Sequence, residues 1–196
     1  TPVYNLLGGK YRDRVRTYTY IYDLDARDNL VSAVVDWWRN PTRLAEHAAR
    51  IADQGFTGLK FDPLMQAIPW GLPAAPWEIS LSEYDHAEKA VAAVREAVGN
   101  RADILIGTHG QITPSCARRR ARWLEPFDPL WLVERCPPEN YRVMGRIARS
   151  RTIPIDRGVR LVTPFEFQNL FAEGACAFAQ PVLGSCGGIT ACMKIA

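Results

Sequence analysis

Short apolar runs alternate along this chain with amphipathic stretches of helical length, and this alternation constrains the fold more than any other feature. The apolar runs are rich in β-branched and aromatic residues, so they are expected to form strands, with helices between them. The expected strands cover residues 16–22, 56–61, 102–106, 129–133, 153–155 and 177–182. The expected helices cover residues 41–54, 82–98, 113–124, 138–150, 164–174 and 188 onward. About six βα units in a row predict a parallel sheet with right-handed crossovers.

Residues that start or stop a helix mark the expected boundaries. Asn40 and Pro41 open the first long helix, because proline suits the first helical turn, and Gly55 closes it. Gly99 has the same closing role for the next helix. These boundary residues support the helical assignments separately from the apolar pattern.

Two architectures fit such a pattern, an open doubly wound sheet and a (β/α) barrel of the TIM type. No glycine-rich phosphate fingerprint follows the first strand, which disfavours the open sheet. The expected ends of the third, fourth and fifth strands fall at Gly107, Val133 and Val159, two intervals of 26 residues. Regular spacing of this kind suits repetition round a barrel. A closed barrel has eight strands, so we expect a barrel short of closure by about two units.

Composition excludes some functions. The net charge of +3 gives no support for nucleic acid or a membrane surface as a partner. The five cysteines are odd in number and lack a CxxC pair, so they are expected to be reduced thiols in a cytoplasmic protein.

In a barrel, reactive groups lie at the carboxyl ends of the strands. The candidate positions are Lys60, Asp62, Gly107, Thr108, His109, Val133, Glu134, Asp156, Arg157, Val159, Arg160, Gln180 and Val182. The segment IGTHGQITPSCARRRARWLEPFDPLWLVERCPPENY contains several of them. With PVYNLLGGKYRDRVRTY, GFTGLKFDP, IPIDRGVRLVTPFEF and LGSCGGIT, it resembles the barrel domain of the enolase superfamily. The resemblance is to mandelate racemase and muconate lactonizing enzymes, in their sugar-acid (galactonate-type) dehydratase branch.

The resemblance implies a carbon–oxygen lyase, or a racemase or isomerase, that removes the proton α to the carboxylate of an acid sugar. It implies Mg²⁺ held by three carboxylates at the ends of strands three, four and five, where the ion stabilises the enediolate. It also implies that residues 1–15 link the barrel to an N-terminal capping domain and that residues 16–196 form a partial barrel.

The chain departs from the family at each metal position. The positions of the three carboxylates are occupied by Gly107, Val133 and Val159, and a common aspartate after strand six is replaced by Val182. Some relatives read Gly-Thr-His-Gly after strand three, so the alternative for Gly107 is a trait of a subgroup, and two or three ligands are replaced. Valine offers no oxygen, and its methyl groups exclude water. We therefore predict that no family ligand is intact and that Mg²⁺ does not bind there.

Three polar residues near this position are candidate catalytic groups. His109 matches a family histidine that serves as a general acid near the leaving hydroxyl; the alternative is a buried histidine bonded to a backbone carbonyl. Lys60 is expected to contact a substrate carboxylate or, equally, to form an ion pair with Asp62 or a neighbouring strand. Asp62 is a candidate base.

Glu134 and Arg160 are expected next to the substrate. Side chains alternate along a strand, so Glu134 does not simply replace residue 133 as a ligand. Arg160 is expected to be a structural ion-pair partner.

Two hypotheses remain open. One is a Mg²⁺-dependent acid-sugar dehydratase lineage. The other is an inactive paralogue or truncated remnant that acts at most as a binding or interaction module. An unclosed barrel exposes strand edges, so we also expect a homo-oligomer or self-association.

Overall fold

The computed structural model describes residues 1–22, 40–64, 78–110, 112–134, 140–150 and 152–196. The strands are β1 (Thr19–Tyr20), β2 (Gly58–Phe61), β3 (Asp103–Ile106), β4 (Trp131–Val133), β5 (Ile155–Arg157) and β6 (Phe178–Ala179). The helices are α1 (Val3–Leu6), α3 (Pro41–Asp53), α4 (Leu81–Val98), α5 (Pro114–Leu124), α6 (Tyr141–Arg149), α7 (Pro164–Ala172) and α8 (Gly188–Ile195). None of the helices in these ranges combines the length and apolar character needed to cross a membrane.

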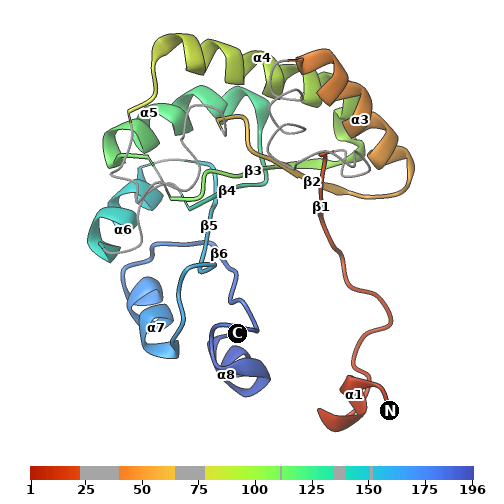
Figure 1. Ribbon diagram of the computed structural model, residues 1–196. Helices are drawn as coiled ribbons and strands as arrows, with labels where there is room; N and C mark the ends of the chain where they lie inside the picture. The colour runs from red at the N-terminus through yellow and green to blue at the C-terminus, as the bar shows by residue number, and fades with distance from the viewer. Residues whose placement is uncertain (23–39, 65–77, 111, 135–139, 151) are drawn as a thin grey trace.

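The strands form one parallel sheet in the order β1-β2-β3-β4-β5-β6, so each strand pairs with its neighbour in sequence. Helices α3 to α8 lie round the outside of the strands, and the segment with α1 extends away from them (Figure 1). A sequential parallel order with helices on one side is the arrangement of a (β/α) barrel rather than of a doubly wound sheet. The expected α/β barrel architecture with six strands is confirmed.

Aromatic contacts across the inner side show that the sheet curls. The ring of Trp131 on β4 lies 5.9 Å from that of Tyr18, which precedes β1, and 4.7 Å from that of Phe178 on β6. Rings from just before β1 and from β6, the two edges of the sheet, therefore meet at the same residue of β4. A flat sheet could not bring its edges to the same residue, so the inner side corresponds to the interior of a barrel.

The outer side of the sheet is a conventional apolar core. Leu59, Phe61, Ile104, Ile106 and Leu132 join one buried cluster with residues of α3 and α4. Because side chains alternate along a strand, the residues between them in sequence face the inner side. The core thus fixes which strand residues can contribute to a site inside the arc.

Helix starts follow the capping chemistry that the sequence predicts. The side chain of Asn40 accepts a hydrogen bond from the backbone of Arg43 at the start of α3, which has proline in its first turn. Helix α4 starts with a capping box in which Ser80 and Glu83 satisfy one another's backbone N–H groups. Such caps fix where each helix begins and therefore where the preceding loop must end.

Strand β5 lies two residues later than expected. The sequence predicts a strand over residues 153–155, whereas the structure has Ile155–Arg157. Asp156 and Arg157 are polar, so the apolar pattern does not include them in the strand, yet both are buried within it. The strand therefore ends at Arg157, and Val159 lies in the turn after it, beyond Gly158 with its positive φ of 123°.

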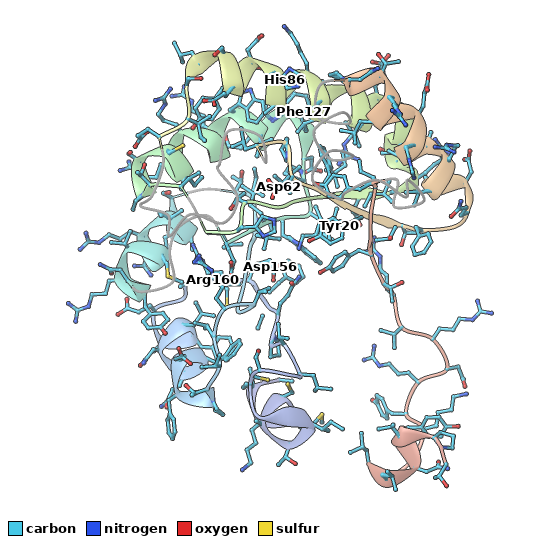
Figure 2. All side chains as sticks on the ribbon, in the orientation of Figure 1. Tyr20, Asp62, His86, Phe127, Asp156 and Arg160 are labelled. Atoms are coloured by element: carbon cyan, nitrogen blue, oxygen red, sulfur yellow. The ribbon has the colours of Figure 1, made fainter. Side chains whose placement is uncertain are left out.

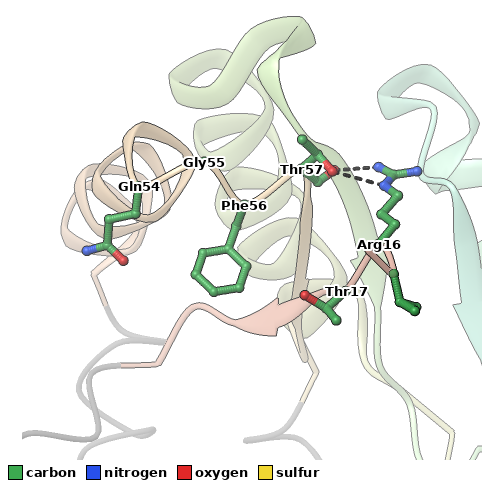
Figure 3. Close-up of a pocket in the computed structure, with 7 residues that line it drawn as sticks. Arg16, Thr17, Gln54, Gly55, Phe56 and Thr57 are labelled. Atoms are coloured by element: carbon green, nitrogen blue, oxygen red, sulfur yellow. Dashed lines mark hydrogen bonds between the residues drawn. The ribbon is translucent and has the colours of Figure 1, made fainter. Parts of the chain in front are cut away.

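A hollow of about 240 Å³ lies at the opposite end of the strands from the candidate site (Figure 3). Arg16 lines it and donates hydrogen bonds to the side-chain oxygen of Thr57 at 2.9 Å and to the Thr57 carbonyl at 2.6 Å. Arg16 also forms an ion pair with Asp103. These three acceptors tie the start of β1 to β2 and β3, so this hollow has a structural role.

Candidate functional site

Buried polar groups gather at one end of the sheet. In the described ranges, the buried polar or charged residues are Lys60, Asp62, Thr108, Glu134, Asp156 and Arg157. All six lie in the last residues of β2 and β5 or directly after β2, β3 and β4; we call them the strand-end cluster. Figure 2 shows Asp62, Asp156 and Arg160 within the arc of the strands, whereas His86 lies on the helical layer. This is the end where barrel enzymes place their reactive groups.

Asp62 and His109 form an ion pair that joins the ends of β2 and β3. Asp62 Oδ2 lies 2.7 Å from His109 Nε2, and the side chain of Asp62 is 2% exposed. The backbone N–H of Asp62 donates to the Tyr22 hydroxyl at 2.7 Å. Hydrogen bonding to Asp62 raises the pKa of His109 above its usual value and outweighs the opposing effect of burial. The pair therefore favours a protonated imidazole at the mouth of the site.

The backbone at His109 has a positive φ of 52°, which is uncommon outside glycine. The side chain of His109 pairs with Asp62, and the charges of Lys60 and Glu134 also affect its pKa. The catalytic role stays a prediction.

Lys60 is buried on the inner side of β2. Its ammonium lies 5.5 Å from the ring centre of Tyr18 and 5.2 Å from that of Tyr20. Rings facing a cation stabilise it when water is excluded. The carboxylate of Asp62 pairs with His109 and not with Lys60. The ammonium of Lys60 therefore faces the rings of Tyr18 and Tyr20 on the inner side of the sheet.

Glu134 departs from the strand pattern. Its φ of 42° interrupts the alternation directly after β4. Its Oε2 lies 3.7 Å from Nε of Arg160, which also donates from Nη2 to the backbone oxygen of His109 at 3.3 Å. Thr108 supports this turn by donating its hydroxyl to the carbonyls of Val133 at 2.6 Å and Glu134 at 2.7 Å. Arg160 is thus an ion-pair partner, as expected, and it connects the ends of strands three, four and five.

Asp156 is the buried group to which the sequence assigned no role. It pairs in register with Val133 and is fully buried, and no other side chain among the described residues donates a hydrogen bond to its carboxylate. Burial raises its pKa to about 7, against the opposing charge of Lys60 and with a further increase from Glu134. The carboxylate directly after the expected strand 153–155 is the sequence signal for Asp156. The apolar pattern places that strand two residues too early, so it does not show that Asp156 lies within the strand.

Gly107, Val133 and Val159, where the sequence resemblance predicts the family's metal ligands, present no oxygen from a side chain. Gly107 has no side chain, Val133 is buried at 2% exposure, and Val159 lies in the turn after β5 with 40% exposure. The neighbouring carboxylates have other surroundings: Asp62 faces His109, Glu134 faces Arg160, and Asp156 has a raised pKa. Within the described ranges no group of three or more His, Cys, Asp or Glu side chains could hold a metal ion.

A curled parallel sheet with polar groups at its carboxyl ends defines a (β/α)-barrel domain. A family model described as "Enolase C-terminal domain-like" matches residues 43–196. The chain belongs to this family.

Relatives of the chain are sugar-acid dehydratases. It is 35% identical over 198 residues to D-xylonate dehydratase of Haloferax volcanii and 34% identical over 195 residues to D-galactonate dehydratase of Xanthomonas oryzae pv. oryzae. All of the chain is covered in both cases, but only 44% and 45% of the two dehydratases, so it spans less than half of their length.

Solved structures agree with this assignment. A mandelate racemase/muconate lactonizing enzyme from a Sulfitobacter species matches with 38% identity and a TM-score of 0.88, over 100% of this chain and 47% of that one. Another from Jannaschia sp. CCS1 matches with 39% identity and a TM-score of 0.86, over 99% of this chain and 48% of that one.

Mg²⁺ prefers oxygen ligands, and the side chains of Gly107, Val133 and Val159 do not fit the ion that the family implies.

Proposed function

We propose that this chain is a barrel of the sugar-acid dehydratase lineage that binds a sugar acid without Mg²⁺ and does not dehydrate it. The observation that carries the proposal is the pair of valines at positions 133 and 159, where the family places metal-binding carboxylates. Hydrocarbon at these positions removes both the ligands and the negative charge that would hold a divalent cation. The chain retains the barrel fold of this enzyme family but has lost the metal-dependent step.

The remaining cations explain how a carboxylate could still bind. Arg160, Lys60 and a protonated His109 lie around the ends of β2, β3 and β5. Charge-assisted hydrogen bonds from such groups to a carboxylate are roughly twice as strong as neutral ones. Glu134 and Asp156 add acceptors for sugar hydroxyl groups. The same groups cannot replace a divalent ion in stabilising two adjacent negative oxygens, which is the requirement for removing an α-proton.

One observation favours residual turnover as a second candidate function. The Asp62–His109 pair raises the pKa of an imidazole that is 37% exposed at the site, which favours its protonated form. An imidazolium in this position can donate a proton to a departing hydroxyl group. Dehydration would still need a base for the α-proton, and Asp62 is held by His109.

The test is a titration of the natural protein with D-galactonate and with D-xylonate, once with Mg²⁺ and once with EDTA. We expect one of the acids to bind with an affinity that EDTA leaves unchanged within about twofold, and no 2-keto acid to form in either buffer. Lys60→Ala should weaken binding by about tenfold or more, since a charged hydrogen bond contributes roughly 1.5–3 kcal/mol. Lys10→Ala is the matched control, because Lys10 is exposed and pairs with Asp13 in the N-terminal segment. Formation of a 2-keto acid that requires Mg²⁺ would contradict the proposal.

A further inference from the structure

The side chain of Asp62 lies where a side chain at position 107 would emerge. A Cβ atom placed on Gly107 would lie 3.1 Å from Asp62 Oδ2 and 3.4 Å from Asp62 Cγ. A contact of 3.1 Å is tighter than nine in ten real Cβ contacts, so Asp62 would have to shift by a few tenths of an ångström. The nearest atoms to this missing side chain are those of a carboxylate from the neighbouring strand.

Charge also opposes a second carboxylate at this point. Two carboxylates that share a site disfavour each other's ionised form. Asp62 is also held in place, since its Oδ2 lies 2.7 Å from His109 Nε2 and its backbone N–H donates to the hydroxyl of Tyr22. A shift of Asp62 away from position 107 would therefore strain its pairing with His109.

We propose that Asp62 and a carboxylate at position 107 are mutually exclusive, so that Asp62 closes the strand-three corner of the family's metal site. In this chain Asp62 is a positioning residue that orients His109 across the ends of β2 and β3. The inference deepens the proposed function and rests on its assignment of Gly107 to the strand-three ligand position. Asp62 is then a further cause of the loss of the metal site, besides the two valines. Exchanging Val133 and Val159 for glutamate is insufficient to restore the site while Asp62 remains.

A thermodynamic cycle on the natural protein tests mutual exclusion directly. Gly107→Asp is made with Asp62 present and in the Asp62→Ala background, and the unfolding temperature is measured at pH 8. With Asp62 present we expect Gly107→Asp to lower the midpoint by roughly 4–8 °C, the shift for a strained and like-charged contact in a domain of this size. In the Asp62→Ala background the loss should be less than half as large. Equal losses in the two backgrounds would overturn the proposal.

Gly184→Asp is the matched control. A Cβ atom at Gly184 meets nothing within 4 Å, and this glycine does not require a positive φ. Its effect should be the same with and without Asp62, which separates specific exclusion from the general cost of an added acid.

A second measurement follows the metal. In the chain that carries Gly107→Asp, Val133→Glu and Val159→Glu together, adding Asp62→Ala is expected to tighten Mg²⁺ binding at least tenfold by calorimetry. Equal or weaker binding after Asp62→Ala would overturn the proposal. Neither measurement involves a sugar acid, so failure here is distinguishable from failure of the proposed binding function.

Discussion

Replacing Asp156 by asparagine is expected to remove most of the loss of stability that this protein undergoes between pH 5 and pH 8. The carboxyl of Asp156 is fully buried, and its pKa in the folded state is raised to about 7. In the unfolded chain it ionises near pH 3.8. Because the folded pKa is the higher one, the folded state favours the proton, and stability declines as the pH rises toward 7.

The size of the effect follows from linkage. Each pH unit between the two pKa values corresponds to about 1.36 kcal/mol, so the Asp156 contribution should fall by about 3 kcal/mol from pH 5 to pH 8. His109 titrates in the same sense, since its pKa is also raised, but it remains in the Asp156→Asn variant. The difference between the two proteins therefore isolates Asp156.

Urea unfolding of both proteins at pH 5 and pH 8 provides the measurement. Asp156→Asn should be the more stable protein at pH 8, and its advantage should shrink at pH 5. Asp85→Asn is the control, because Asp85 is exposed on α4 and pairs only with Lys89 among the described residues. Parallel pH profiles for wild type and Asp156→Asn would show that Asp156 is not the buried acid that the structure places on β5.

Truncating Phe167 to alanine is expected to lower the free energy of unfolding by about 3–5 kcal/mol, as for other large aromatic residues in cores. The ring is fully buried in the cluster that includes residues of α6, α7 and α8. It lies directly against the backbone after β5, since a Cβ atom on Gly158 would be 2.6 Å from its Cε1. Removing the ring would leave a cavity under the turn that carries Val159.

The same helix supplies a matched control. Phe165 is two residues away on α7 and is 76% exposed, so Phe165→Ala should change stability by no more than about 0.5 kcal/mol. The measurement is the urea midpoint and slope for both variants at one pH. Similar losses for the two variants would mean that the orientation of α7 differs from the one described.

The architecture was predictable because it depends on local signals. Asn40 and Pro41 mark the start of α3, and Gly99 directly follows the end of α4, as their backbone chemistry implies. The six-strand order followed from the βα alternation. Strand β5 was displaced because Asp156 and Arg157, although polar, are buried within it. Hydrophobic pattern cannot identify a strand whose buried residues are charged.

The site was predictable only in part, because pairing across strands is not encoded locally. Lys60, Asp62 and His109 were identified from their places at strand ends. That Asp62 pairs with His109 rather than with Lys60 depends on how β2 and β3 lie side by side. The contact of Asp62 with Gly107 has the same origin. The alternation of side chains along a strand also could not predict the positive φ of Glu134.

Calorimetric titration of the natural protein with Mg²⁺ tests the central claim most directly, the loss of the family's metal site. The account predicts no one-to-one site of submillimolar affinity, because Gly107, Val133 and Val159 offer no ligand oxygen from their side chains. A stoichiometric Mg²⁺ site of submillimolar affinity in the natural protein would contradict it.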